Sequence, residues 1–373
     1  MVCYAILSTL VNLGMFCLQI SRKVLLIGEI EGRIAIFLAY QRYIFIKLLC
    51  QVIVYECFPK CLDTINMENA PYKISGHETF PCRYSWLPKV IQGIQKDPNL
   101  FKNEDQAMVT FGVGKNMVRA IRFWGESFGI IDTKKKSGSF LVSPFGEAIF
   151  GKKGFDPFFQ DIRTLWLLHW GLSANNDRPL LAWNFLLNKW HEPEWTKTKI
   201  LTVLDQELSK NGADISQNTI EHHLDVFIHT YVPTRSRGGE PQEDTLDCPF
   251  VDLNFIEKVG ERTESLGGRR EPIYSFNRSP KTEITSQMFA YCLNDFFTKN
   301  HPNEQSLSFT EICVGPCSPG QIFKLSETDI REYLLRIQKQ TGAFAFKESA
   351  ALQHVFLSKK LNPLELLGRV YNN

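Results

Sequence analysis

The sequence predicts a mainly α protein of the α+β class, with an N-terminal winged helix-turn-helix followed by a helical region and a smaller α+β C-terminal region. Two observations carry this prediction. Apolar residues at helical spacing, with start and stop signals, recur along most of the chain after residue 67. Within residues 85–150 the expected order is helix, helix, glycine turn, helix and basic hairpin, which is the order of a winged helix.

The composition is that of a globular protein long enough for two or three domains. The chain has 373 residues, of which 44% are hydrophobic and 22% are charged, and nothing in this balance indicates long disorder or a coiled coil. The formal net charge is only +2. Any affinity for nucleic acid must therefore come from a local basic patch.

The first 66 residues differ from the rest of the chain. They hold five of the ten cysteines, and their apolar runs lack a clear period or helix caps. A membrane span over 35–57 would carry Arg42 and Lys47 near its centre, which is costly, so we expect no membrane association. We interpret 1–66 as an atypical extension that a start-site error upstream of Met67 would explain. Five scattered cysteines remain after it, which favours reduced thiols and a cytoplasmic protein.

We predict three regions after this extension: a winged helix-turn-helix DNA-binding domain over 67–150, a helical region over 151–240 and an α+β region over 241–373. In the first region we expect helices near 86–95, 104–111 and 116–128, with Asn103 and Gln106 as a capping box. The segments IIDT and FLVS flank KKKSG and predict a hairpin with a basic tip. In the other two regions we expect helices over 156–172, 180–190 and 282–299, a helical stretch over 198–232 with a break at Asn211–Asp214, and a capped helix that starts at Ser326.

The stretch TFGVGKNMVRAIRFW, residues 110–124, contains GxGK, but it does not fit a phosphate-binding loop. That loop requires a glycine at 109 and a serine or threonine at 116, where this chain has Val109 and Asn116. The glycines instead allow a sharp turn between two helices.

The third expected helix has two faces. Met117, Ile121, Trp124 and Phe128 form an apolar stripe, while Lys115, Arg119 and Arg122 fall on roughly the opposite side. A recognition helix would place Asn116, Arg119 and Arg122 near base edges, and the hairpin lysines would meet phosphates. The predicted DNA-binding residues are Lys115, Asn116, Arg119, Arg122, Lys134, Lys135 and Lys136. The alternative is a solvated basic face on a structural domain.

Five blocks carry a family resemblance: GHETFPCRYSWLPK (76–89), FGVGKNMVRAIRFWGESFGII (111–131), DPFFQDIRTLWLLHW (156–170), EDTLDCPFVDL (243–253) and PGQIFKLSE (319–327). In this order, over about 74–360, the chain resembles the prokaryotic domain-of-unknown-function family 4007. The resemblance implies a companion of DNA phosphorothioation and phage-defence gene clusters. It also implies partners, namely a reductase-like sulfur-transfer enzyme and an ATPase. The family it points to includes a member with a DNA-nicking role.

Candidate catalytic residues are carboxylates, because a nicking enzyme uses them to hold Mg²⁺ or Mn²⁺. The candidates are Asp156, Asp161, Glu243, Asp244 and Asp247. Asp156 stands at the start of the expected helix over 156–172, where an N-cap role is the alternative. His222, Asp225 and His229 share one face of an expected helix and are candidate metal ligands, although an ordinary helix surface explains them equally.

The leading functional hypothesis is a DNA-binding component of a phosphorothioation-linked modification or defence system, with metal-dependent nicking as its candidate chemistry. Two alternatives remain open. One is a non-catalytic adaptor that brings the sulfur-transfer enzyme or the ATPase to DNA, and the other is a transcriptional regulator. The sequence predicts no organic cofactor.

Overall fold

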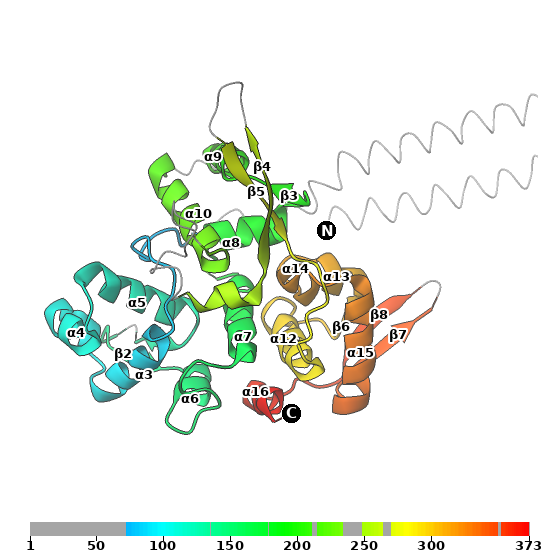
Figure 1. Ribbon diagram of the computed structural model, residues 1–373. Coiled ribbons are helices and arrows are strands. Elements are labelled where there is room, and N and C mark those ends of the chain that lie inside the picture. The colour runs from blue at the N-terminus through cyan, green and yellow to red at the C-terminus, as the bar shows by residue number, and fades with distance from the viewer. Residues whose placement is uncertain are drawn as a thin grey trace, which may run out of the picture. The chain divides into compact units, whose positions relative to one another are not determined.

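A computed structural model describes residues 72–134, 136–177, 179–210, 215–233, 248–263, 270–349 and 352–372. All of them lie in one compact unit, Ala70–Asn373. The fold mixes α-helices with small antiparallel sheets (Figure 1). The expected extension over 1–66 lies outside the described residues, and the three region boundaries after it stay predictions.

The helices account for most of the ordered elements. The α-helices are α3 (Trp86–Lys96), α4 (Glu104–Phe111), α5 (Lys115–Ser127), α6 (Pro144–Phe150), α7 (Ile162–Ser173), α8 (Leu181–Asn184), α9 (Lys197–Lys210), α10 (Gln217–Tyr231), α12 (Ser286–Lys299), α13 (Phe309–Val314), α14 (Pro319–Phe323), α15 (Glu327–Thr341) and α16 (Pro363–Tyr371). In the part of the chain that the structure describes, they are supplemented by the 3₁₀-helices η1 (Leu100–Lys102) and η3 (Pro249–Leu253) and by the π-helix η2 (Phe185–Lys189). Within the described residues, no helix has the length and apolar character needed to cross a membrane.

Over the described residues, the strands form three antiparallel sheets. These are β1 (Ile131–Thr133) with β2 (Phe140–Val142); β3 (Glu194–Trp195), β5 (Arg270–Phe276) and β4 (Ile256–Thr263) in the order β3-β5-β4; and β6 (Ser306–Ser308), β8 (Gln353–Leu357) and β7 (Phe344–Glu348) in the order β6-β8-β7. In the last sheet β8 is central, since Ser306 and Ala345 both pair with Phe356.

The elements α3 to β2, which we call the N-terminal module, follow the order predicted from the sequence. Asn103 accepts a hydrogen bond from the Gln106 amide and caps α4, and Gly112 ends that helix with a φ of 70°. Helix α5 packs on α3 and α4 through its apolar stripe, in which Ile121 and Trp124 are fully buried. The predicted hairpin is confirmed by the pairing of β1 with β2.

An aromatic core joins this module to the rest of the unit. Trp124 stacks on Phe128 at 5.3 Å between ring centroids, and Phe128 stacks on Phe250 of η3 at 5.3 Å. The Trp124 indole donates to the carbonyl of Phe80. Because burial of such rings is the main favourable term in folding, the orientation of α5 is set by its buried face.

Several helix boundaries differ from the prediction. The helix expected over 180–190 changes from α8 to the π-helix η2 at Phe185. By contrast, the helical stretch expected over 198–232 is confirmed as the two helices α9 and α10, and its expected break at 211–214 lies outside the described residues. The predicted capping box at Ser326 and Asp329 is confirmed at the start of α15.

Candidate nucleic-acid interface

The predicted basic stripe of α5 is exposed to solvent. The side chains of Lys115, Arg119 and Arg122 are 56%, 45% and 47% exposed, and Asn116 beside them is also exposed. Lys115, Arg119 and Arg122 extend from the side of α5 that faces away from the buried Trp124, and Asn116 lies at the edge of that side. The structure therefore gathers these four residues on one accessible helix face.

One acidic side chain partly neutralises this face. Glu104, in the first turn of α4, lies 2.7 Å from the Lys115 ammonium and 2.8 Å from Nε of Arg119. Hydrogen bonds from Arg119 and then Lys115 lower the pKa of Glu104 to about 2. Sequence analysis missed this contact, because Glu104 and Arg119 belong to different helices and meet only when α4 packs against α5.

Arg122 connects the basic stripe of α5 to the hairpin. Its guanidinium lies 5.0 Å from the centroid of the Phe140 ring in β2, and its Nε lies 3.6 Å from Glu126. The same Glu126 carboxylate accepts a hydrogen bond of 2.7 Å from the Thr133 hydroxyl in β1. The helix face and the hairpin are thus held next to each other.

The hairpin turn presents the predicted lysines. Lys134 and Lys136 are exposed, whereas Lys135 lies outside the described residues. The turn is fastened to the module by Lys102 of η1, whose ammonium donates to the carbonyl of Ser137 at 2.8 Å. Lys134 and Lys136 thereby extend the exposed positive charge of Lys115, Arg119 and Arg122, and we call these five cations with Asn116 the basic face.

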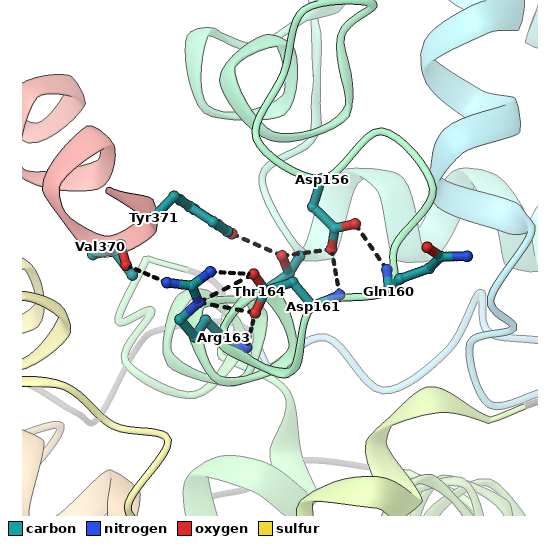
Figure 2. A network of polar contacts seen from close by, with 7 residues as sticks. All are labelled: Asp156, Gln160, Asp161, Arg163, Thr164, Val370 and Tyr371. Carbon is teal, nitrogen blue, oxygen red and sulfur yellow. Dashed lines mark hydrogen bonds and ion pairs between the residues drawn. The ribbon is translucent and has the colours of Figure 1, made fainter. Parts of the chain in front are cut away.

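The candidate catalytic carboxylates Asp156 and Asp161 are held by structural hydrogen bonds. The predicted helix start at Asp156 is wrong, because α7 begins at Ile162 and Asp161 is its N-cap. Asp156 is buried and accepts hydrogen bonds from the amides of Gln160 and Asp161 and from the Thr164 hydroxyl (Figure 2). It therefore fastens the turn that leads into α7.

Asp161 is paired with Arg163 in the same network. Burial acts to raise the pKa of Asp161, but hydrogen bonds from the Arg163 side chain and amide outweigh it and lower that pKa. Arg163 also donates to the carbonyl of Val370, and Thr164 hydrogen-bonds the Tyr371 hydroxyl at 2.7 Å (Figure 2). These bonds tie α7 to the end of α16, so the geometry explains both carboxylates as structural residues.

The candidate metal ligands lie on α10. The Asp225 carboxylate forms an ion pair of 2.7 Å with Lys197 of α9. His222 is exposed and His229 is partly exposed, with a pKa that burial lowers. Among the residues that the structure describes, no group of three or more His, Cys, Asp or Glu side chains could hold a metal ion.

The carboxylates of the segment EDTLD belong to a part of the chain that the structure does not describe. Glu243, Asp244 and Asp247 all fall within 234–247, outside the described residues. Their candidacy as metal ligands stays a prediction.

A buried histidine pair beneath α5 also escaped sequence analysis. The Thr79 amide donates to Nδ1 of His77, so Nε2 of His77 carries the proton. That proton faces two acceptors, the Ile74 carbonyl at 3.1 Å and Nδ1 of His223 at 3.0 Å. The His77 ring packs edge-on against Phe123 of α5 at 5.4 Å. In the sequence, His77 is marked by its place in the block GHETF. In the structure, the next two residues, Glu78 and Thr79, adopt positive φ angles of 49° and 67°.

Comparisons with known proteins give the family and the fold. The model of a family described as "Protein of unknown function (DUF4007)" matches residues 74–371. Curated proteins give no match. Two solved structures are similar: one of SspB with a bound magnesium ion (TM-score 0.67) and one of SspB (TM-score 0.68). Each is 24% identical over 81% of this chain and 87% of the other chain.

At this identity the two structures show a shared fold. The family model covers most of the chain and includes the whole N-terminal module, α10 and the C-terminal helix α16. The chain belongs to the DUF4007 family.

Proposed function

We propose that this protein binds duplex DNA through its N-terminal module, which acts as a winged helix. The observation that carries the proposal is the basic face, which has exposed cations on α5 and on the β1–β2 turn in a chain of net charge +2. Arg122 of α5 lies over the Phe140 ring of β2, so the helix contacts the hairpin. A local cluster of this kind is what electrostatic attraction to phosphates requires.

Helix α5 is the recognition helix in this proposal. Its N-cap is Gly114, which offers no side-chain hydrogen bond to the first amides of the helix. Those amides and the positive end of the helix dipole are available to a phosphate. Asn116 and Arg119, within the first two turns, are the residues placed to reach base edges, and Lys134 and Lys136 contact the backbone as the wing.

We further propose that the protein works as a cytoplasmic DNA-binding component of a phosphorothioation-linked modification or defence system. Membership of the DUF4007 family and the fold shared with SspB support this role. The proposed partners are the reductase-like sulfur-transfer enzyme and the ATPase that the family resemblance implies. In this role the basic face brings those partners to DNA.

Metal-dependent nicking is the second candidate function. The likeness to a magnesium-bound SspB structure favours it over a purely adaptor role. The carboxylates Asp156 and Asp161 are engaged in hydrogen bonds within the fold, so Glu243, Asp244 and Asp247 become the first residues to test.

Two assays test the two functions separately. In the first, a labelled DNA duplex is titrated with protein, and we expect binding that weakens as salt rises. Absence of binding at low salt would overturn the proposal.

In the second assay, supercoiled plasmid is incubated with Mg²⁺ or Mn²⁺ and, as a control, with EDTA. Open-circular product that requires the metal and is lost in Asp244→Ala supports nicking. Binding without any open-circular product supports the adaptor role.

A further inference from the structure

The sheet β6-β8-β7 buries one face and leaves the other partly exposed. Leu307, Val355 and Phe346 point to the buried face, where Phe309 packs on Phe346 at 5.6 Å. Because side chains alternate along a strand, the neighbouring residues point the other way. We call this other side the outer sheet face, and its strand residues are Ser306, Ser308, Ala345, Lys347, His354 and Phe356.

Two rings stand on the central strand of this face. His354 and Phe356 are partly exposed, and their ring centroids are 6.2 Å apart. Among the described residues, Phe356 belongs neither to the hydrophobic core nor to the partly buried side chains packed against it. Small residues oppose the rings, namely Ala345 and Ser306 at Phe356 and Ser308 at His354. On the β6 side the two rings therefore meet only serines, and on the β7 side Phe356 meets Ala345 and His354 meets Lys347.

The charge on this face is positive. Lys347 pairs with His354 across the sheet, and its ammonium lies 5.1 Å from the Phe356 ring centroid. None of the six strand residues of the outer sheet face is acidic. The nearest strand carboxylate, Glu348, points to the opposite face and pairs there with Arg331. Lys359 and Lys360 follow β8 and are exposed.

We propose that the outer sheet face binds single-stranded DNA, with unpaired bases stacked on Phe356 and His354 and the backbone attracted by Lys347. Aromatic rings on a sheet with adjacent cations are the combination that binds single strands without sequence preference. In a duplex the bases are stacked inside the helix, so we expect this face to prefer single-stranded DNA to duplex DNA. This site is separate from the basic face and extends the proposed function to a second form of DNA.

The test measures the anisotropy of a fluorescein-labelled oligothymidine as protein is added. We expect wild type to bind and Phe356→Ala to bind about tenfold more weakly, because one stacked base is lost. Phe356→Leu keeps an apolar side chain at the site and should weaken binding similarly, whereas Phe356→Trp should retain it. Phe158→Ala is the matched control, because Phe158 is an aromatic residue that is 76% exposed outside this sheet.

A duplex titration in parallel separates this proposal from the DNA-binding function of α5. Arg119→Glu should lose duplex binding and keep oligothymidine binding, while Phe356→Ala should do the reverse. The proposal is overturned if wild type does not bind oligothymidine, if Phe356→Ala and Phe356→Leu bind it as wild type does, or if Arg119→Glu abolishes it. If wild type binds oligothymidine but not the duplex, only the proposed role of α5 is contradicted.

Discussion

At the scale of single residues, Glu104 partly neutralises the positive charge of the basic face. It holds Lys115 and Arg119 through two short contacts, and these cations are the ones that a phosphate would approach. In the proposed duplex complex, a phosphate would therefore compete with a carboxylate that is already in place. The same contacts keep Glu104 ionised well below neutral pH, because its pKa is about 2.

Glu104→Gln is predicted to strengthen duplex binding. The substitution removes a negative charge next to the expected phosphate contacts and keeps the shape of the side chain. We expect a gain of several-fold at low salt that shrinks as salt rises, since screening weakens interactions between exposed charges. Asp105→Asn, on the neighbouring exposed residue, is the control and should change affinity less. An affinity that falls in Glu104→Gln would mean that Glu104 positions the cations instead of competing for them.

Three buried histidines predict acid sensitivity of the fold. Burial lowers the pKa of His77 to about 4 and those of His169 and His223 to about 3. The unfolded chain has a histidine pKa of about 6.5, so it binds more protons than the folded chain below that pH. Stability is therefore complete above about pH 6.5 and is lost as the pH falls from about 6.5 toward about 4.

Urea unfolding at a series of pH values measures this effect. Between about pH 6.5 and 5.5 ordinary carboxylates stay ionised, so a fall in the unfolding free energy there reports mainly on histidines. We expect unfolding to take up about three protons near the lower end of this window. A free energy that does not change with pH over this interval would contradict the neutral state of the pair His77–His223.

At the scale of elements, the proposed DNA-binding role assigns phosphate contacts to the lysines of the hairpin. Changing Lys134, Lys135 and Lys136 together to Ala should weaken duplex binding and reduce the slope of log K against log salt by about 2 to 3, because each lost phosphate contact removes about 0.9. Lys152→Ala with Lys153→Ala, exposed lysines of the loop after α6, is the control. An unchanged slope in the triple variant would reject the wing as a contact.

The turn before α7 depends on Asp156. Removing its carboxylate in Asp156→Ala leaves the amides of Gln160 and Asp161 without their acceptor, and we expect a loss of about 1–3 kcal/mol in the free energy of unfolding. Asp205→Ala, on an exposed position of α9, should have little effect. DNA binding by folded Asp156→Ala should equal that of wild type. A variant that is fully stable but unable to nick plasmid would return Asp156 to the catalytic candidates.

The elements that sequence analysis placed correctly are those with local signals. Asn103 with Gln106, Gly112, and Ser326 with Asp329 mark helix ends through contacts within a few residues. The start of α7 was missed because the apolar run after Asp156 looks helical, although the Asp156 side chain holds it as a turn. The pairing of β6 with β8 joins segments far apart in the chain, and no local pattern reveals it.

The residues of the candidate site likewise fall into those with a local sequence signal and those that depend on tertiary contacts. The basic side chains of α5 followed from helical spacing, since Ile121 and Trp124 fix which side is buried. Glu104, the pair His77–His223 and the outer sheet face depend on tertiary contacts between distant segments. Sequence spacing also suggested a metal face at Asp225, but it gave no means of seeing that Lys197 of α9 would pair with that carboxylate.

At the scale of the whole molecule, the protein combines a nearly neutral charge with a localised cationic surface. A net charge of +2 gives little non-specific attraction to DNA, so affinity must arise where Lys115, Arg119 and Arg122 are concentrated. Phe128, at the end of α5, stacks on Phe250 and joins the module to the aromatic core. The basic face is therefore presented by a rigidly packed helix, which suits recognition of a duplex groove.

The most direct test of this account is the salt dependence of duplex binding by wild type and Arg119→Glu, measured by fluorescence anisotropy. The account predicts that log K for wild type falls linearly with log salt. It also predicts that Arg119→Glu, with an unchanged thermal unfolding curve, binds at least about tenfold more weakly and with a shallower slope. Equal affinity and equal slope for the two proteins would show that α5 does not contact DNA.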